Sequence, residues 1–412
     1  MKLTLSKIST GARLGVISSL GRNGAQTLEV PGCLLYTKTG SPPHLTHDTL
    51  QTIDGVPSVT HITLSTLVEH QEVIEEYKEG IGKFAGMPDA ILYCSLHDPV
   101  TPCPAGYNTN KVVSLWGTGG RLEMTPQKFV SAQRVLRADW FQCLSDGEVT
   151  PGGNSKKRIK KSVDRSLAFL DQCLQLLAKH EELKHCAVIG AVEGGEQLDE
   201  RLRSARETAK RPVGGFLLDG FHGSSMDRDT KLSLISAVTD ALPEDKPRLI
   251  HGMGRPDEVL DCVQKGVDLF DSCFPYQVTE RGCALVFNHC YHLDPETTVV
   301  EKNEPSDGER NGDEREELDA DDSEMTSFEI CLKEKRFQED FRPLIEGCAC
   351  FSCRRHTRAY IHHLLTVKEL LAGILLMIHN FQHYFNFFSS IRSALREGKL
   401  DVLAGIIRKQ AS

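Results

Sequence analysis

The stretch from Cys186 to Gly195, "CAVIGAVEGG", has the composition of a buried β-strand that ends in glycines, and it opens the alternation that decides the fold. Further apolar runs follow, separated by helix-like segments of ten to fourteen residues. This spacing is typical of βα units, whose strands form a parallel sheet. The expected elements are a helix over Leu198–Lys210, a strand over Val213–Gly220, a helix over Thr230–Pro243, a strand over Arg248–Gly254, a helix over Pro256–Gly266 and a strand over Val267–Phe274.

The same alternation extends toward the N-terminus. The segment Thr125–Trp140 predicts a helix with threonine as its N-cap and proline at its first position, and Lys160–His180 predicts a long amphipathic helix. At least six strand–helix alternations result, and no Gly-x-Gly-x-x-Gly motif follows the first strand. We therefore expect an α/β protein built on a (β/α)₈ TIM barrel and not on an open, doubly wound sheet.

The first 28 residues contain no acids but several basic and hydroxyl side chains, a composition found in mitochondrial transit peptides. The run "GARLGVISSLG", which begins at Gly11, instead places turn glycines around alternating apolar residues. That pattern predicts an antiparallel hairpin, and we favour an N-terminal antiparallel β segment over a transit peptide.

The acidity of the chain is confined to one segment. The 412 residues carry a formal net charge of −9, and Glu301–Glu324 holds twelve acids and three bases, which accounts for all of it. The remainder is neutral overall, so an anionic partner is not excluded. We expect residues 1–300 to form the β segment and most of the barrel, 301–325 to be a disordered acidic insertion, and 326–412 to form a zinc-binding subdomain with closing helices.

Fourteen cysteines without a secretory signal predict reduced thiols or metal ligands and not a disulfide framework. The longest apolar run, Leu370–Ile378, is far too short for a membrane span, which needs about 20 residues. Cys348, Cys350 and Cys353 are close enough in sequence to wrap one cation, and a fourth ligand would complete a closed structural zinc site. The residues leave five candidates for that ligand, namely His356, His362, His363, His379 and His383.

Several motifs together resemble the tRNA-guanine transglycosylases. They are the three-cysteine spacing with a histidine after 25 further residues, "HGMGRPDEVLDCVQKGVDLFDSCFP" from His251, "RPVGGFLLDG" from Arg211 and "SDGEVTP" from Ser145. The resemblance covers roughly residues 110–395. It implies a (β/α)₈ barrel with a zinc subdomain and selects His379 as the fourth ligand of one structural Zn²⁺.

The family reaction exchanges guanine at the anticodon wobble position of tRNA for a 7-deazaguanine, which is queuine in eukaryotes. A carboxylate attacks the ribose C1′, and a second acid moves protons. By resemblance, Asp271 matches the nucleophile position. The remnant of the base pocket is implied to comprise Asp146, Glu193, Gly214 and Gly215.

The sequence departs from the family pattern at several of these positions. The family's Asp-Ser-Gly-Gly loop, which carries the second catalytic acid, should fall near Tyr93–Pro99, where this chain has "YCSLHDP" and Asp98 stands outside that motif. Glu193 replaces a glutamine and is expected to bring a negative charge where an amide should donate. The family's Pro-Thr-Arg after the nucleophile strand is "PYQ" (Pro275–Gln277). These losses predict that no residue of this chain is catalytic.

The pattern therefore resembles the non-catalytic subunit of a heterodimer. We expect a catalytic queuine tRNA-ribosyltransferase subunit and tRNA as partners, with basic clusters near Lys156 and Arg201 available to phosphates. Two alternatives stay open: an active base-exchange enzyme with Asp271 as nucleophile, and a zinc scaffold without an RNA role. Asp271 is explained equally well as a retained acid that only caps the next loop and as a residue with residual function. A cytoplasmic location is expected, with peripheral attachment to the mitochondrial outer membrane left open.

Overall fold

The computed structural model describes residues 1–21, 23–104, 106–147, 155–222, 226–292 and 325–411. Contacts divide the chain into two compact units. The barrel unit comprises Met1–Pro43 and Pro57–Cys273, and the metal unit comprises His44–Val56 and Phe274–Ser412. The acidic segment of the sequence, up to residue 324, lies outside the described residues, so its expected disorder stays a prediction. The expected division into 1–300, 301–325 and 326–412 also stays a prediction.

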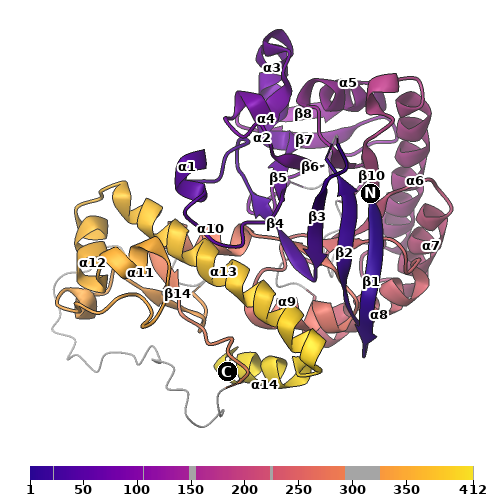
Figure 1. Cartoon of the computed structure of the whole chain (residues 1–412). Coiled ribbons are helices and arrows are strands. Elements are labelled where there is room, and N and C mark those ends of the chain that lie inside the picture. Colours follow the sequence, from indigo (N-terminus) through magenta and orange to yellow (C-terminus); the bar gives the residue numbers. More distant parts are fainter. Residues whose placement is uncertain (22, 105, 148–154, 223–225, 293–324, 412) are drawn as a thin grey trace. The chain divides into compact units, whose positions relative to one another are not determined.

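Eight parallel strands close a barrel in the first unit (Figure 1), which confirms the expected fold. Their order around the barrel is β10, β11, β12, β13, β4, β5, β6 and β9, and every neighbouring pair is parallel. The strands are β4 (Gly32–Tyr36), β5 (Val59–Thr63), β6 (Ile91–Ser95), β9 (Trp140–Gln142), β10 (Ala187–Val192), β11 (Gly215–Leu218), β12 (Arg248–Ile250) and β13 (Leu269–Asp271).

Helices surround this barrel and pack on one another in chain order from α5 to α9. They are α5 (Pro126–Leu136), α6 (Lys156–Leu177), α7 (Leu198–Ala209), α8 (Arg228–Ala241) and α9 (Pro256–Gln264), preceded by the short α2 (Leu64–Leu67), α3 (Gln71–Tyr77) and α4 (Gly80–Phe84). Strands β7 (Val113–Gly117) and β8 (Gly120–Met124) form a separate antiparallel hairpin. Gly190 in β10 is required for this packing, because a Cβ there would lie 2.4 Å from Cγ2 of Thr208 in α7.

The ends of two expected helices differ from the prediction. Helix α5 begins as expected, with the Thr125 side chain accepting a hydrogen bond from the Lys128 amide, but it ends at Leu136 because Arg137 adopts a left-handed conformation with φ of 58°. Trp140, expected in that helix, opens strand β9 instead. Helix α6 begins at Lys156, earlier than expected, since Ser155 caps it by accepting from the Arg158 amide.

The N-terminal residues form the expected antiparallel β segment. Strands β1 (Lys2–Ser9), β2 (Ala12–Leu20) and β3 (Gln26–Val30) make a three-stranded antiparallel sheet. Its buried Ile17 and Val30 share one apolar core with the first residues of four barrel strands, which are Val59, Ile91, Trp140 and Leu269. The sheet therefore closes the end of the barrel where the strands begin. The opposite end, where the strands terminate, carries the polar side chains.

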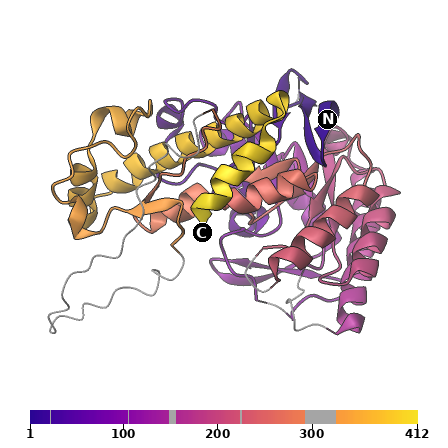
Figure 2. The ribbon, with the colours of Figure 1, turned by 90° about the horizontal axis from the view of Figure 1, so that it is seen from below.

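The metal unit is built around its longest helix, α13 (Leu371–Glu397), from whose end α14 (Leu400–Ala411) turns back after Gly398 (Figures 1 and 2). Its other elements are α1 (His47–Leu50), α10 (Cys273–Glu280), β14 (Cys283–Leu285), β15 (Glu329–Cys331), α11 (Phe351–Arg355) and α12 (Arg358–Thr366). Ile330, Leu344, Ile361 and Leu376 belong to its apolar core. Among the described residues, none of the helices combines the length and the apolarity that crossing a membrane requires.

Candidate functional site

Four side chains of the metal unit converge on one point. The Nδ1 atom of His379 lies 3.9 Å from the sulfur of Cys348, 3.5 Å from that of Cys350 and 3.4 Å from that of Cys353. All four ligand atoms lie within 4.8 Å of one another. In a tetrahedral site with Zn–S of about 2.3 Å and Zn–N of about 2.0 Å, neighbouring ligand atoms are about 3.5–3.8 Å apart. The cluster therefore fits one metal ion of that size.

Hydrogen bonds outside the cluster orient its ligands. The ring of His379 is fully buried, and its Nε2 atom donates to the carbonyl of Leu285 in β14 at 2.9 Å, which leaves the lone pair of Nδ1 facing the sulfurs. Cys350 is the N-cap of α11, and its sulfur accepts from the Cys353 amide at 3.3 Å. Thiol hydrogen bonds from Cys350 and Cys353 hold the pKa of Cys348 far below its usual range. Thiolate charge is thus already favoured where a cation would bind.

The remaining candidate histidines have other hydrogen-bond partners or lie outside this cluster. His383 bonds through Nε2 to the carbonyl of Phe287 at 2.9 Å, and His362 bonds through Nδ1 to the carbonyl of Leu332 at 2.8 Å. Within the part of the chain that the structure describes, the metal-ligand group consists of Cys348, Cys350, Cys353 and His379.

A second polar cluster lies where the barrel strands end, which is where active sites of this fold are found. Asp271 is the last residue of β13, Glu193 directly follows β10, and Asp98 and Asp146 follow β6 and β9 within four residues. All four carboxyl groups are buried. The structure therefore brings the sequence-predicted acids to one end of the barrel.

Gly214 and Gly215 lie at the other end. Gly215 is the first residue of β11, and a Cβ on Gly214 would meet the Cβ of Ala187, the first residue of β10. The structure therefore does not bring these two glycines together with Asp271 and Glu193.

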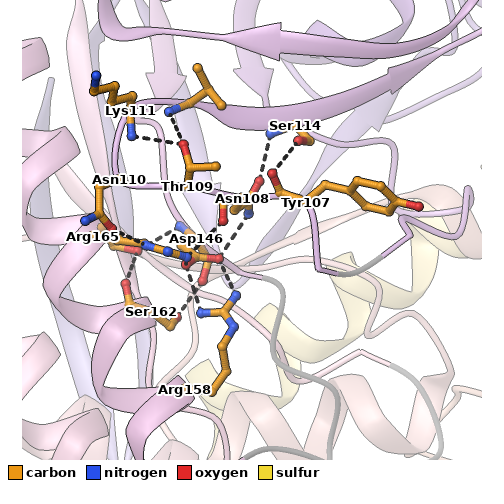
Figure 3. Close-up of polar contacts among 12 residues, drawn as sticks. Tyr107, Asn108, Thr109, Asn110, Lys111, Ser114, Asp146, Arg158, Ser162 and Arg165 are labelled. Atoms are coloured by element: carbon orange, nitrogen blue, oxygen red, sulfur yellow. Dashed lines mark hydrogen bonds and ion pairs between the residues drawn. The ribbon is translucent and has the colours of Figure 1, made fainter.

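The carboxylate of Asp146 is saturated by side chains of the same chain (Figure 3). Its Oδ1 atom accepts from Nη2 of Arg158 at 2.6 Å and from Nδ2 of Asn108 at 3.0 Å. Its Oδ2 atom accepts from Nη1 of Arg158 at 2.9 Å and from Nη1 of Arg165 at 3.0 Å. Burial alone would raise the pKa of Asp146, but these bonds outweigh it and lower the pKa. An ionised carboxylate offers about four lone-pair sites, and all of them are used.

Glu193 lies in a buried pocket of charges formed with Asp219 and Arg201. Burial and the neighbouring charge of Asp219 raise the pKa of Glu193 well above its usual range, which favours the protonated carboxyl. This shift opposes the expected negative charge at this position, which stays a prediction. A protonated Glu193 can donate one hydrogen bond, and it shares one with Asp219.

Asp271 and Asp98 both accept hydrogen bonds from groups of the barrel unit that lie close to them. The two oxygens of Asp271 accept from the amides of Gly252 at 2.6 Å and Cys273 at 3.0 Å. Asp98 accepts from the hydroxyl of Tyr36 at 2.9 Å and from Thr101 and the Val100 amide in its own turn. The geometry around Asp271 supports the interpretation of a strand-end acid that caps the next loop.

Sequence reasoning missed the cations that neutralise this end of the barrel. Arg201 lies in a basic cluster that the sequence makes available to phosphates, yet it is fully buried and donates to the carbonyls of Gly195, Val192 and Asp219 at 2.6–2.8 Å. Arg158, in the basic cluster near Lys156, is partly buried and bonds to Asp146. The available signal was the seven-residue spacing from Arg158 to Arg165, which puts both on one face of α6.

His61 makes this end of the barrel sensitive to acid. Its ring is fully buried and stacks on His251 with centroids 5.0 Å apart, and among the described residues its Nδ1 has no hydrogen-bond partner. Burial lowers its pKa to about 3. The unfolded chain binds a proton near pH 6.5 and the folded chain does not, so stability is present above pH 6.5 and is lost as the pH falls toward 3.

We expect the free energy of unfolding to fall by about 2 kcal/mol more between pH 7.5 and pH 5 in the unmodified protein than in a His61→Asn variant. Urea unfolding at both pH values measures this difference. Equal pH dependence in the two proteins would show that folding does not lower the pKa of His61.

The fold and the candidate metal centre define a class: (β/α)₈ barrel proteins with a Cys₃His cluster that fits one metal ion. The chain belongs to the queuine tRNA-ribosyltransferase family, since the family model described as "Queuine tRNA-ribosyltransferase" matches residues 8–411. A protein of Xenopus tropicalis named "Queuine tRNA-ribosyltransferase accessory subunit 2" is 79% identical over the full length of both chains. Proteins of the same name from Gallus gallus (98% and 96% covered) and Homo sapiens (100% of both chains) are 61% and 59% identical.

Proposed function

We propose that this chain is the non-catalytic subunit of a heterodimeric queuine tRNA-ribosyltransferase, which exchanges wobble guanine for queuine in tRNA anticodons. The names of its relatives support the accessory role. The observation that carries the proposal is the saturation of Asp146 by Arg158, Arg165 and Asn108. In the related enzymes this position belongs to the base pocket, where a carboxylate must keep free lone pairs for the N–H groups of a purine.

The guanidinium group of Arg158 explains why this position is unsuited to a base. It presents two parallel N–H donors to Asp146, at 2.6 and 2.9 Å, in the bidentate arrangement that guanidinium and carboxylate groups prefer. A base would have to displace both bonds to the buried carboxylate and leave the partly buried guanidinium of Arg158 without its partner, which is unfavourable. A second argument is the absence of the family's second catalytic acid, because Asp98 is engaged in its own turn.

The cluster of three cysteines and His379 is proposed to hold one structural Zn²⁺. Four protein ligands leave no open coordination position, so the ion would supply folding energy and not a reactive water. By likeness to the family, the metal unit would form the interface with the catalytic subunit.

A basic surface beside the Asp146 cluster supports the tRNA role. Lys111, Lys161 and Arg165 line a cavity of about 490 Å³ together with Thr109, Asn110 and Asp164, so cations outnumber acids in its lining three to one. The second basic run is less suited to phosphates, since Arg203, Lys210 and Arg211 are paired with acids of α6 and α7. A cytoplasmic location, with peripheral attachment to the mitochondrial outer membrane as the alternative, stays a prediction.

The proposal predicts that the purified chain alone does not incorporate labelled guanine into tRNA, whereas the complex with a catalytic subunit does. In that complex, Asp271→Asn in this chain is expected to leave the exchange rate within about twofold of the unmodified complex. Circular dichroism of the variant establishes that the barrel remains folded.

Two results would overturn this assignment. Exchange by the chain alone, abolished by Asp271→Asn, would establish the active-enzyme alternative. A reconstituted complex that binds tRNA no more tightly than the catalytic subunit alone, at every salt concentration tested, would favour a zinc scaffold without an RNA role.

A further inference from the structure

Two cysteines of the metal unit lie opposite each other on neighbouring strands. Cys283 in β14 and Cys331 in β15 are Cα partners in an antiparallel pair. The amide of Leu332 donates to the carbonyl of Gly282 at 3.1 Å, so the adjacent pair is hydrogen-bonded and the cysteine pair is of the non-hydrogen-bonded kind. Such pairs have Cα atoms about 4.5 Å apart. This separation lies within the range of about 4.4–6.8 Å that disulfides span.

The two thiols differ in acidity because they share one hydrogen bond. The thiol of Cys283 lies 3.8 Å from the carbonyl of Arg281, to which it can donate. Its interaction with the sulfur of Cys331 lowers the pKa of Cys331 to about 7, against the opposing effect of burial. The same interaction and burial raise the pKa of Cys283. At neutral pH about half of the Cys331 side chains are therefore ionised to the nucleophilic thiolate, beside a protonated Cys283 thiol. Cys331 is 6% exposed and Cys283 is fully buried, so only a small oxidant can reach them.

A second thiol pair provides a contrast within the same chain. Cys143, just after β9, shares a hydrogen bond with Cys173 of α6, and both are buried. Burial raises the pKa of Cys143 well above its usual range. Cys143 is therefore a weaker candidate than Cys331 for the thiolate that attacks an oxidant.

We propose that Cys283 and Cys331 are a redox modification site, which forms a reversible disulfide on exposure to a small peroxide. The Cys331 thiolate attacks one peroxide oxygen and breaks the O–O bond, which gives a sulfenic acid and, after protonation, one water. The Cys283 sulfur then attacks the sulfenic sulfur, the S–S bond forms, and the hydroxyl leaves with the thiol proton as a second water. Both thiols are oxidised and the peroxide is reduced, so electrons balance.

The bond would join the two ends of a long stretch of chain. Cys283 and Cys331 flank residues 284–330, which contain the whole acidic segment. β14 also supports the metal centre, because the carbonyl of Leu285 accepts from His379 and Asn380 bonds to both Leu285 and Cys283. A disulfide would therefore fasten the base of the acidic segment and the strand that orients the metal-ligating histidine. This inference is independent of the proposed accessory function.

The test is disulfide mapping of the full chain loaded with one equivalent of Zn²⁺ and treated with one equivalent of hydrogen peroxide. Free thiols are blocked with iodoacetamide, and the protein is cut with trypsin without reduction. The expected product is the peptide 282–302 linked to the peptide 316–333, at least tenfold more abundant than any link between Cys143 and Cys173. Dithiothreitol should reverse it. Because the first peptide also contains Cys290, the Cys290→Ser variant should give the same link.

Variants separate the two thiols. Cys283→Ser should abolish the link and leave a sulfenic acid on Cys331 that dimedone traps, whereas Cys143→Ser should leave the link unchanged. The proposal is overturned if peroxide treatment of the unmodified protein leaves Cys283 and Cys331 as free thiols, which iodoacetamide then alkylates. It is equally overturned if Cys143 and Cys173 link as readily, or if the metal-ligating cysteines are oxidised first with release of zinc.

Discussion

Cys350→Ser is expected to remove the bound metal and to unfold much of the metal unit. The sulfur of Cys350 lies 3.5 Å from Nδ1 of His379, caps helix α11 and is 2% exposed, so neither water nor a neighbouring side chain can take its place as ligand. A structural zinc contributes about 10–16 kcal/mol to the folding of small zinc domains, and loss of one ligand forfeits a large part of that energy. We expect destabilisation of the unit by at least about 4 kcal/mol.

Metal analysis and thermal unfolding check this prediction. The unmodified chain should hold one metal ion and lose it, with much of its helix signal, in excess chelator. The matched control is Cys290→Ser, because Cys290 belongs to the same unit but lies outside the ligand cluster. A Cys350→Ser protein that retains one metal ion, and that still binds a catalytic subunit, would contradict the structural role of the cluster.

Arg201→Met should be the most damaging substitution in the barrel unit. The guanidinium donates to three carbonyls, lies 4.1 Å from the ring centre of Phe221 and is close to the carboxyl groups of Glu193 and Asp219. Burial lowers its pKa to about 10, which still leaves it charged at neutral pH. Methionine fills similar space but cannot replace the hydrogen bonds to the carbonyls of Gly195 and Asp219, and it removes the positive charge beside the carboxyl group of Asp219. We expect a loss of about 3–5 kcal/mol in the free energy of unfolding.

Urea unfolding of the variant measures this loss. Arg203→Met is the control on the same helix, since Arg203 is about one third exposed and pairs with Asp164 and Glu200 at the surface. Exposed pairs contribute about 0–1 kcal/mol, so the control should stay within that range. Similar losses in the two variants would show that Arg201 is not the buried anchor described here.

Local sequence patterns predicted most of the helices and strands of the barrel. The apolar run of β10, the capping threonine before α5 and the Pro256 start of α9 depend on neighbours within a few residues, and these elements form where expected. The end of α5 could not be predicted in the same way. Arg137 is an ordinary helix former, but it adopts a left-handed conformation here. Trp140 lies in a strand and not in the helix because its side chain packs in the core of the barrel.

The amino-acid sequence by itself determined the barrel, its N-terminal β segment and the three cysteines of the candidate metal site, because strand–helix periodicity and cysteine spacing are local properties of the chain. Resemblance to the family selected His379 from five candidate histidines, and the structure brings its Nδ1 atom within 3.9 Å of the three sulfurs. Only the tertiary structure decided which charged side chains pair, and which are buried, at the end of the barrel where the strands terminate. Which cation meets which acid depends on side chains far apart in sequence, as when Asn108 and Arg158 both reach Asp146. Burial, which no local pattern reports, then made Arg201 an internal anchor and raised the pKa of Glu193, since removing a group from water changes its preferred charge.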